Sequence, residues 1–333
     1  MDQAGKFSTV ATRALIALLV MAAGLGAGQR AGAQAFPAKP IQWVSPWTAG
    51  GGNDILSRAL AEQLSSRLGQ PVVVENRPGA TGTIGTAQVA RAAPDGHTLT
   101  LASAATHATA PAIYSKLSYD PVADFTPITL VATVANVLVV HPSVPATDLK
   151  ELVAYAKANP NKLNFSSVGA GSIQHLSGVM FNQLAGVQTA HVPYKGTAPA
   201  VVDLLAGRVQ MAFESLPTML PHIRSGALRA IGVTTPVRSE VLPELPTLAE
   251  AGLTGFDASL WYAVMGPAGI PQPVVKVLHD TVVASLQSPE VMRRLSEQGA
   301  QLATSSPEEL AEFVRKDTEK WRGFIKRAGV TLD

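Results

Sequence analysis

The feature that most constrains the fold is an apolar run followed by a loop almost without side chains and then an amphipathic helical pattern. Ile41–Trp47 predicts a short buried strand, and Thr48–Gly52 predicts the loop. Asn53 or Asp54 is expected to cap the helix Ile55–Leu68 that follows. Backbone N–H groups and the positive end of the dipole at a helix start favour a negative charge. The segment therefore predicts an anion-binding loop.

Strand-like apolar runs alternate with helical patterns along most of the chain. This alternation is typical of α/β proteins with largely parallel sheets. The predicted strands are 41–46, 71–75, 98–102, 137–141, 163–168, 189–192, 209–213 and 228–234. The predicted helices are 55–68, 84–92, 147–158, 172–184, 198–206, 219–225, 273–286 and a last one that begins at Ser306–Glu309, a capping box with proline at its first helical position.

The first 35 residues have the pattern of a cleaved secretory signal peptide. Lys6 and Arg13 precede an apolar run at 14–27, and small residues follow it. Cleavage is expected after Ala35, with Ala33 as the alternative. The run is too short, and too rich in glycine at its end, to favour a membrane anchor. The mature chain, from residue 36, is therefore expected in the periplasm.

Composition narrows the classes of function. Removing the N-terminal segment takes away three basic residues and one acidic residue, so the formal net charge falls from +2 to zero. A neutral chain has no global field to attract nucleic acid, and no nucleic-acid partner is expected. The chain contains no cysteine, which excludes disulfides, thiolate metal sites and cysteine nucleophiles.

Five further motifs follow one another along the chain: GQPVVVENRPGATGTIG at 69–85, PDG at 94–96, HVPYKGTAPAVVDLLAG at 191–207, LPELPTLAEAG at 242–252 and WYAVMGPAGIP at 261–271. Together they resemble the Bug family, the extracytoplasmic receptors of tripartite tricarboxylate transporters. The resemblance implies an α/β fold of the two-lobed periplasmic-binding-protein (Venus flytrap) type. One lobe would be 36–135 plus 235–333, and the other would be 136–234. Crossing segments near 134–137 and 234–237 would form the hinge beside an interlobe cleft.

The resemblance also implies a function. The chain would be a receptor, not an enzyme, that captures a small carboxylic acid and delivers it to membrane permease subunits. We expect a monomer with no cofactor and no metal ion. Two alternatives stay open: a hydrolase or transferase that uses Asp203 or a histidine as general base, and a sensor that docks on a signalling partner. The type of carboxylate, whether aliphatic, amino or aromatic, also stays open.

Three loops share one construction, because each follows a predicted strand and opens a predicted helix: Thr48–Asp54, Ser103–His107 and Gly169–Ser172. In open α/β sheets, ligands bind beyond the carboxyl ends of the strands, where these loops would lie. The resemblance implies that the first and third loops hold a carboxylate through backbone N–H groups, hydroxyls and water. The matching residues are Thr48, Ala49, Gly50 and Gly51 in the first loop and Gly169, Ala170, Gly171 and Ser172 in the third. Tight turns and an N-cap role for Ser172 are the structural alternatives.

Six more residues are candidate ligand contacts, each with a structural alternative: Trp47, Asp54, Ser103, Thr106, His107 and Asp203. Trp47 would stack on a planar ligand or cover the core. Asp54 would brace the loop, and Asp203 would either accept from a ligand or lie on an exposed helix face. The seven histidines show no metal-ligand spacing. GATGTIG at 79–85 lacks the G-x-G-x-x-G spacing and is expected to be a structural turn.

Overall fold

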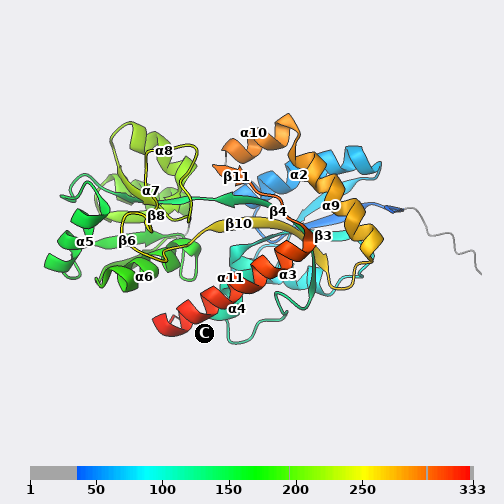
Figure 1. The fold of residues 1–333 in the computed structure, drawn as a ribbon, viewed down its shortest axis with the longest axis horizontal. Helices are drawn as coiled ribbons and strands as arrows, with labels where there is room; N and C mark the ends of the chain where they lie inside the picture. Colours follow the sequence, from blue (N-terminus) through cyan, green and yellow to red (C-terminus); the bar gives the residue numbers. More distant parts are fainter. Residues whose placement is uncertain (1–35, 195, 298, 331–333) are drawn as a thin grey trace, which may run out of the picture. The chain divides into compact units, whose positions relative to one another are not determined.

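The computed structural model describes residues 36–194, 196–297 and 299–330 (Figure 1). The expected signal peptide at 1–35 lies outside the described residues. The chain divides into two units, Met1–Ala38 and Lys39–Asp333, and the fold below is that of the second unit. None of the described helices combines the length and apolar character that crossing a bilayer requires.

Two mixed sheets organise this unit. One has six strands in the order β11-β4-β10-β3-β1-β2, and the other has five in the order β7-β6-β8-β5-β9. The strands of the first sheet are β1 (Ile41–Ser45), β2 (Val72–Asn76), β3 (Thr98–Ser103), β4 (Phe125–Val134), β10 (Leu260–Pro267) and β11 (Ala300–Leu302). Those of the second are β5 (Asn136–Val140), β6 (Asn164–Ser167), β7 (Ala190–Pro193), β8 (Met211–Ser215) and β9 (Arg229–Val233).

The expectation of largely parallel sheets is wrong. β1 runs parallel to β2 and β3, and β6 runs parallel to β7 and β8. β10, however, is antiparallel to both β3 and β4, and β5 is antiparallel to β8 and β9. The physical reason is the path of the chain: β4 leads out of the first sheet toward the second, and β10 leads back, so these strands run in opposite directions.

The helices are α2 (Gly52–Leu68), α3 (Thr83–Ala90), α4 (Ala110–Ile113), α5 (Leu149–Ala158), α6 (Ile173–Ala185), α7 (Thr197–Leu205), α8 (Leu216–Arg224), α9 (Gln272–Leu286), α10 (Pro289–Glu297) and α11 (Pro307–Ala328). A short 3-10 turn, Ala80–Gly82, and a π-helical turn, Ala105–Thr109, precede α3 and α4. The predicted capping box of α11 is confirmed, since Ser306 accepts from the Glu309 N–H and Glu309 accepts from the Ser306 N–H. Sequence patterns predicted neither α4 nor α10.

The helix α2 shows why the first predicted segment folds as it does. Leu56, Leu60 and Leu64 recur every four residues and are fully buried on one face. Gly51 is the N-cap, so the prediction of Asn53 or Asp54 in that position is wrong. The reason is that both side chains are engaged elsewhere: the Asn53 amide donates to the Leu101 carbonyl at 2.8 Å and thereby ties the start of the helix to β3.

The chain crosses between the sheets at two places that are joined by hydrogen bonds. Only Ala135 separates the end of β4 from the start of β5. On the return path, Thr234 donates its N–H to the Asn136 carbonyl at 2.9 Å and accepts from the Asn136 N–H through its hydroxyl at 3.2 Å. Its carbonyl accepts from the Ala258 N–H at 3.0 Å. Thr234 therefore fastens the outgoing and returning segments together.

Candidate functional site

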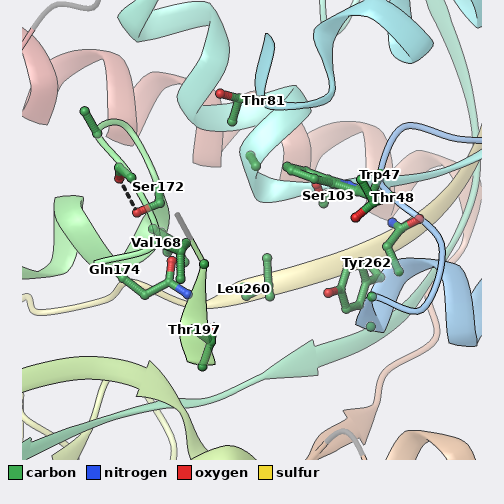
Figure 2. A pocket seen from close by; sticks show the side chains of 18 residues that line it. Trp47, Thr48, Thr81, Ser103, Val168, Ser172, Gln174, Thr197, Leu260 and Tyr262 are labelled. Atoms are coloured by element: carbon green, nitrogen blue, oxygen red, sulfur yellow. Dashed lines mark hydrogen bonds between the residues drawn. The ribbon is translucent and has the colours of Figure 1, made fainter. Parts of the chain in front are cut away.

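A cavity of about 640 Å³ is lined by loops from both sheets. Figure 2 shows Trp47, Thr48 and Ser103 on one side of it, and Val168, Ser172, Gln174 and Thr197 on the other. The lining residues are Trp47, Thr48, Gly51, Gly52, Asn53, Thr81, Ser103, Ala105, Val168, Gly169, Ala170, Ser172, Ile173, Gln174, Gly196, Thr197, Leu260 and Tyr262. Seven of the fourteen predicted site residues are in this set: Trp47, Thr48, Gly51, Ser103, Gly169, Ala170 and Ser172.

The first loop is held in shape by Asp54, whose residue is only 3% exposed. One carboxylate oxygen accepts the Gly50 N–H at 2.9 Å, and the other accepts the Asn76 side-chain amide at 2.8 Å. Arg58 donates to the same carboxylate at 3.1 Å. Burial raises the pKa of Asp54, but the hydrogen bonds from Arg58, Gly50 and Asn76 outweigh it and hold the pKa below its ordinary value. Asp54 and Gly50 thus satisfy each other rather than line the cavity.

The third loop is held by a similar set of contacts, made within the loop and to the first turn of α6. Ser172 donates its hydroxyl to the Gly169 carbonyl at 2.7 Å (Figure 2) and accepts the His175 N–H as the N-cap of α6. The Gly171 N–H donates to His175 Nδ1 at 3.1 Å. Gly171 is buried and its N–H is occupied, so Gly169, Ala170 and Ser172 supply the part of this loop that lines the cavity.

Two helix starts open onto the cavity. Gly52 and Asn53 begin α2, and Ile173 and Gln174 begin α6, and all four line the cavity. The first N–H groups of a helix have no partner within the helix. Among the described residues, none accepts a hydrogen bond from these four N–H groups. The cavity therefore has unpaired donors and two positive dipole ends facing it from both sides.

The second predicted loop contributes less to the cavity. Ser103 lines it, whereas Thr106 and His107 are fully buried behind it. The Thr106 hydroxyl is paired with His107 Nδ1 at 2.9 Å, and the His107 ring lies edge-on to Phe125 at 4.6 Å between centroids. Burial lowers the pKa of His107 to about 3, so the ring is neutral. The structure gives Thr106 and His107 a place in the core.

Asp203 and Ala49 also lie outside the lining set. The Asp203 carboxylate accepts from Arg208 at 2.6 Å and from the Tyr194 hydroxyl at 2.9 Å. The hydrogen bond from Arg208, followed by that from Tyr194, lowers the pKa of Asp203. A carboxylate that is paired and ionised in this way is a poor general base at neutral pH.

Sequence reasoning did not identify several residues that shape the cavity. Thr81 belongs to the turn that was expected to be purely structural, yet its side chain reaches the cavity (Figure 2). Tyr262, on β10, forms part of the wall, and burial raises its pKa to about 12, so its hydroxyl stays protonated. Glu214, at the end of β8, lies behind the wall and bonds to both Gln174 and Thr197. Nothing local in the sequence separates Glu214 from an ordinary strand residue.

The described residues contain no group of three or more histidine, aspartate or glutamate side chains placed to hold a metal ion. The lining residues themselves are uncharged. The arrangement is therefore one for binding through amides, hydroxyls and helix ends.

We expect the folded state to lose stability as the pH falls from about 6.5 to about 4. His175 and His191 stack behind the third loop with ring centroids 4.1 Å apart. Burial lowers the pKa of both rings, and His175 lowers that of His191 further, to about 4. The unfolded chain therefore binds protons more readily than the folded chain over this range, and the pair contributes a loss of roughly 1–3 kcal/mol. His107, whose pKa burial lowers to about 3, adds to the loss in the same direction. Urea unfolding at stepped pH values measures it.

The control for this pH dependence is His191→Gln, which removes the ring with the lower pKa. Its free energy of unfolding should fall less steeply between pH 6.5 and 4 than that of the wild type. Equal slopes would show that the histidine pair does not carry the effect.

The chain matches the tripartite tricarboxylate transporter family receptor over residues 56–330. Protein BugT of Bordetella pertussis is 38% identical over 322 residues, which are 96% of this chain and 99% of BugT. A protein from the tcbD-tcbE intergenic region of Pseudomonas sp. strain P51 is 39% identical over 292 residues, with 87% of each chain covered.

Solved structures show the same two-lobed fold. The periplasmic binding protein BugD is similar with a TM-score of 0.75 and 38% identity, over 89% of this chain and all of BugD. An R. palustris protein solved with adipate gives a TM-score of 0.77 and 37% identity, over 89% of this chain and 100% of its own. MatC from Rhodopseudomonas palustris, solved with bound malate, gives a TM-score of 0.74 and 34% identity. The match covers 87% of this chain and 100% of MatC.

Proposed function

This chain belongs to the tripartite tricarboxylate transporter receptor family, and from that premise we propose that it captures a small carboxylic acid in the 640 Å³ cavity and delivers it to the permease subunits of such a transporter. Members of the family are solute-binding receptors, which sets the chain apart from the hydrolases and transferases considered as alternatives. We further propose that the protein works in the periplasm after cleavage of its signal peptide.

The observation that carries the proposal is the pair of helix starts at one uncharged cavity. A carboxylate placed between Gly52 and Ile173 would accept from amides of α2 and α6 and would meet the positive ends of both dipoles. Hydrogen bonds to a charged group contribute more than neutral ones, about 1.5–3 kcal/mol each. A neutral ligand of the same shape would gain much less.

The relatives support the size of the ligand. Adipate and malate, found with two of the similar structures, are acids of six and four carbons. A cavity of about 640 Å³ accommodates acids of this length. We propose acids of four to six carbons as the first to test.

Thermal unfolding with matched acids and amides tests the carboxylate site. An acid at a hundredfold excess over its dissociation constant should stabilise the protein by about 2.7 kcal/mol and raise the melting temperature by roughly 5–10 °C. The corresponding amide should give a much smaller shift, because it lacks the charge that the helix ends compensate. Equal shifts for an acid and its own amide would rule out charge recognition at this cavity.

The lobes and their movement are also part of the proposal. We propose that residues 36–135 with 235–333 and residues 136–234 close on the ligand by rotation at the two crossing segments. The contacts of Thr234 support this, because they couple both segments at one place.

A further inference from the structure

Glu214 has a buried carboxyl group directly behind the cavity wall. The residue is 5% exposed and precedes Ser215, the last residue of β8, whose N–H donates to Glu214 Oε1 at 2.8 Å. Gln174 Nε2 donates to the same oxygen at 3.3 Å. The Thr197 hydroxyl donates to Oε2 at 3.2 Å. Two of these three donors, Gln174 and Thr197, line the cavity, and Figure 2 shows both side chains on the same wall.

These contacts decide which hydrogen-bonding groups the wall presents to a ligand. A threonine hydroxyl has one hydrogen, and Thr197 gives it to Glu214, so its lone pairs are what remains for the cavity. Gln174 turns its amide nitrogen to Glu214, so its carbonyl oxygen and one N–H remain. This part of the wall is therefore richer in acceptors than in donors, unlike the helix starts of α2 and α6.

A ligand that spans the cavity meets both environments. Its carboxylate would lie at the helix starts, and its other end would reach Gln174 and Thr197. A second carboxylate there would place its oxygens, which can only accept, against the acceptor oxygens of Gln174 and Thr197. It would also bring a negative charge close to the Glu214 carboxylate, and both effects oppose binding. A hydroxyl group would instead donate to Thr197 or to Gln174, and an amino group could donate to both.

We propose that Glu214 determines specificity at this end of the cavity, and that the preferred ligand is a monocarboxylate whose far end carries a hydroxyl or amino group rather than a second carboxylate. The proposal rests on the carboxylate site proposed above. It assigns Glu214 a positioning role, since it acts through Gln174 and Thr197 and does not itself line the cavity.

Calorimetric titration of the full chain with matched acids tests the proposal. The pairs are 6-hydroxyhexanoate with adipate and 4-hydroxybutanoate with succinate, each measured at pH 8 because burial raises the pKa of Glu214. The hydroxy acid of at least one pair should bind at least about tenfold more tightly than the diacid. In Glu214→Gln, the new amide can donate to Thr197, which frees the Thr197 hydrogen for the cavity. The ratio of the affinity for the hydroxy acid to that for the diacid should then fall at least about tenfold or reverse.

Glu151→Gln is the matched control. Glu151 also accepts a threonine hydroxyl and a backbone N–H, both from Thr147 at 2.7 Å, but it lies on an exposed surface away from the cavity. The Glu151→Gln variant should prefer the hydroxy acid over the diacid to the same extent as the wild type. Thr197→Val provides a second test that leaves Glu214 in place: it should weaken binding of the hydroxy acid more than binding of the diacid.

The outcomes separate this proposal from the one on which it rests. If the wild type prefers both diacids, or if neither Glu214→Gln nor Thr197→Val changes the preference, the role of Glu214 is wrong while the carboxylate site stands. If no acid of either pair binds, the carboxylate site is wrong and the role of Glu214 falls with it.

Discussion

Gly51→Val is expected to weaken binding of a small carboxylic acid about a hundredfold while the protein remains folded. Gly51 is the N-cap of α2 and lines the cavity, and a Cβ added there meets only the Thr48 carbonyl, at 3.5 Å. Its φ of −77° suits a residue with a side chain, so valine projects into the cavity without backbone strain. Losing two charge-assisted hydrogen bonds costs about 3 kcal/mol or more, which corresponds to the hundredfold loss. Titration calorimetry with the best acid from the thermal screen measures it.

Gly51→Ala and the melting temperature serve as controls for this variant. Alanine adds only one carbon and should weaken binding less than valine does. Valine is a poorer N-cap than glycine, so a drop of about 1 kcal/mol in the free energy of unfolding is expected in Gly51→Val. A valine variant with wild-type affinity would show that the α2 start does not contact the ligand. Gly171→Val is less informative, because Gly171 has a φ of 80° and a substitution there strains the backbone itself.

Asp54→Ala is expected to lower the free energy of unfolding by roughly 2–4 kcal/mol. The substitution leaves the Gly50 N–H and the Asn76 amide without the Asp54 oxygens that they contact, and it removes one of the two partners of Arg58, which also donates to Asn76. It should also weaken ligand binding, because the Thr48–Gly52 loop loses its support. Urea unfolding measures the stability, and calorimetry measures the affinity.

Two comparisons make the Asp54 experiment specific. Asp280→Ala removes an exposed carboxylate that pairs with Lys276 one helical turn away, and because solvent screens this pair the loss of stability should be much smaller than in Asp54→Ala. Asp54→Asn keeps the shape of the side chain and loses its charge, so its loss of stability should lie between those of Asp280→Ala and Asp54→Ala.

Because the pKa of Asp54 is lowered in the folded state, its ionic contribution to stability is present above the ordinary aspartate range and is lost as the pH falls through the lowered pKa. The difference in free energy of unfolding between the wild type and Asp54→Asn should therefore become smaller in acid. A difference that does not change with pH would show that the charge of Asp54 does not stabilise the loop.

Local patterns predicted the elements whose sequence repeats with a clear period. β1 and α2 follow from an apolar run and from leucines four residues apart, and α11 follows from its capping box. β4 was missed because Pro127 interrupts a run that otherwise suits a strand, and a proline argues against a central strand. β10 was missed because it is buried along nearly its whole length and so shows no alternation. β11 has only three residues.

The candidate site was predictable as loops but not as side chains. Glycine-rich turns after strands located the Thr48–Gly52 and Gly169–Ser172 loops, because backbone conformation at glycine is a local property. The direction of a side chain depends on tertiary packing. Sequence therefore could not show that His107 packs on Phe125, that Thr81 reaches the cavity, or that Glu214 lies behind Gln174.

Each of the two loops at the cavity is braced by the helix that follows it, and this has a kinetic consequence for the proposed binding. Asp54 fixes the first loop and His175 contacts the third, without help from the opposite side. An arriving acid therefore finds each half of the site already shaped, and no loop has to be ordered during the encounter. The association rate should then depend on diffusion into the cavity, whereas under the proposed closure the residence time of the bound acid should depend on how fast the crossing segments around Thr234 reopen.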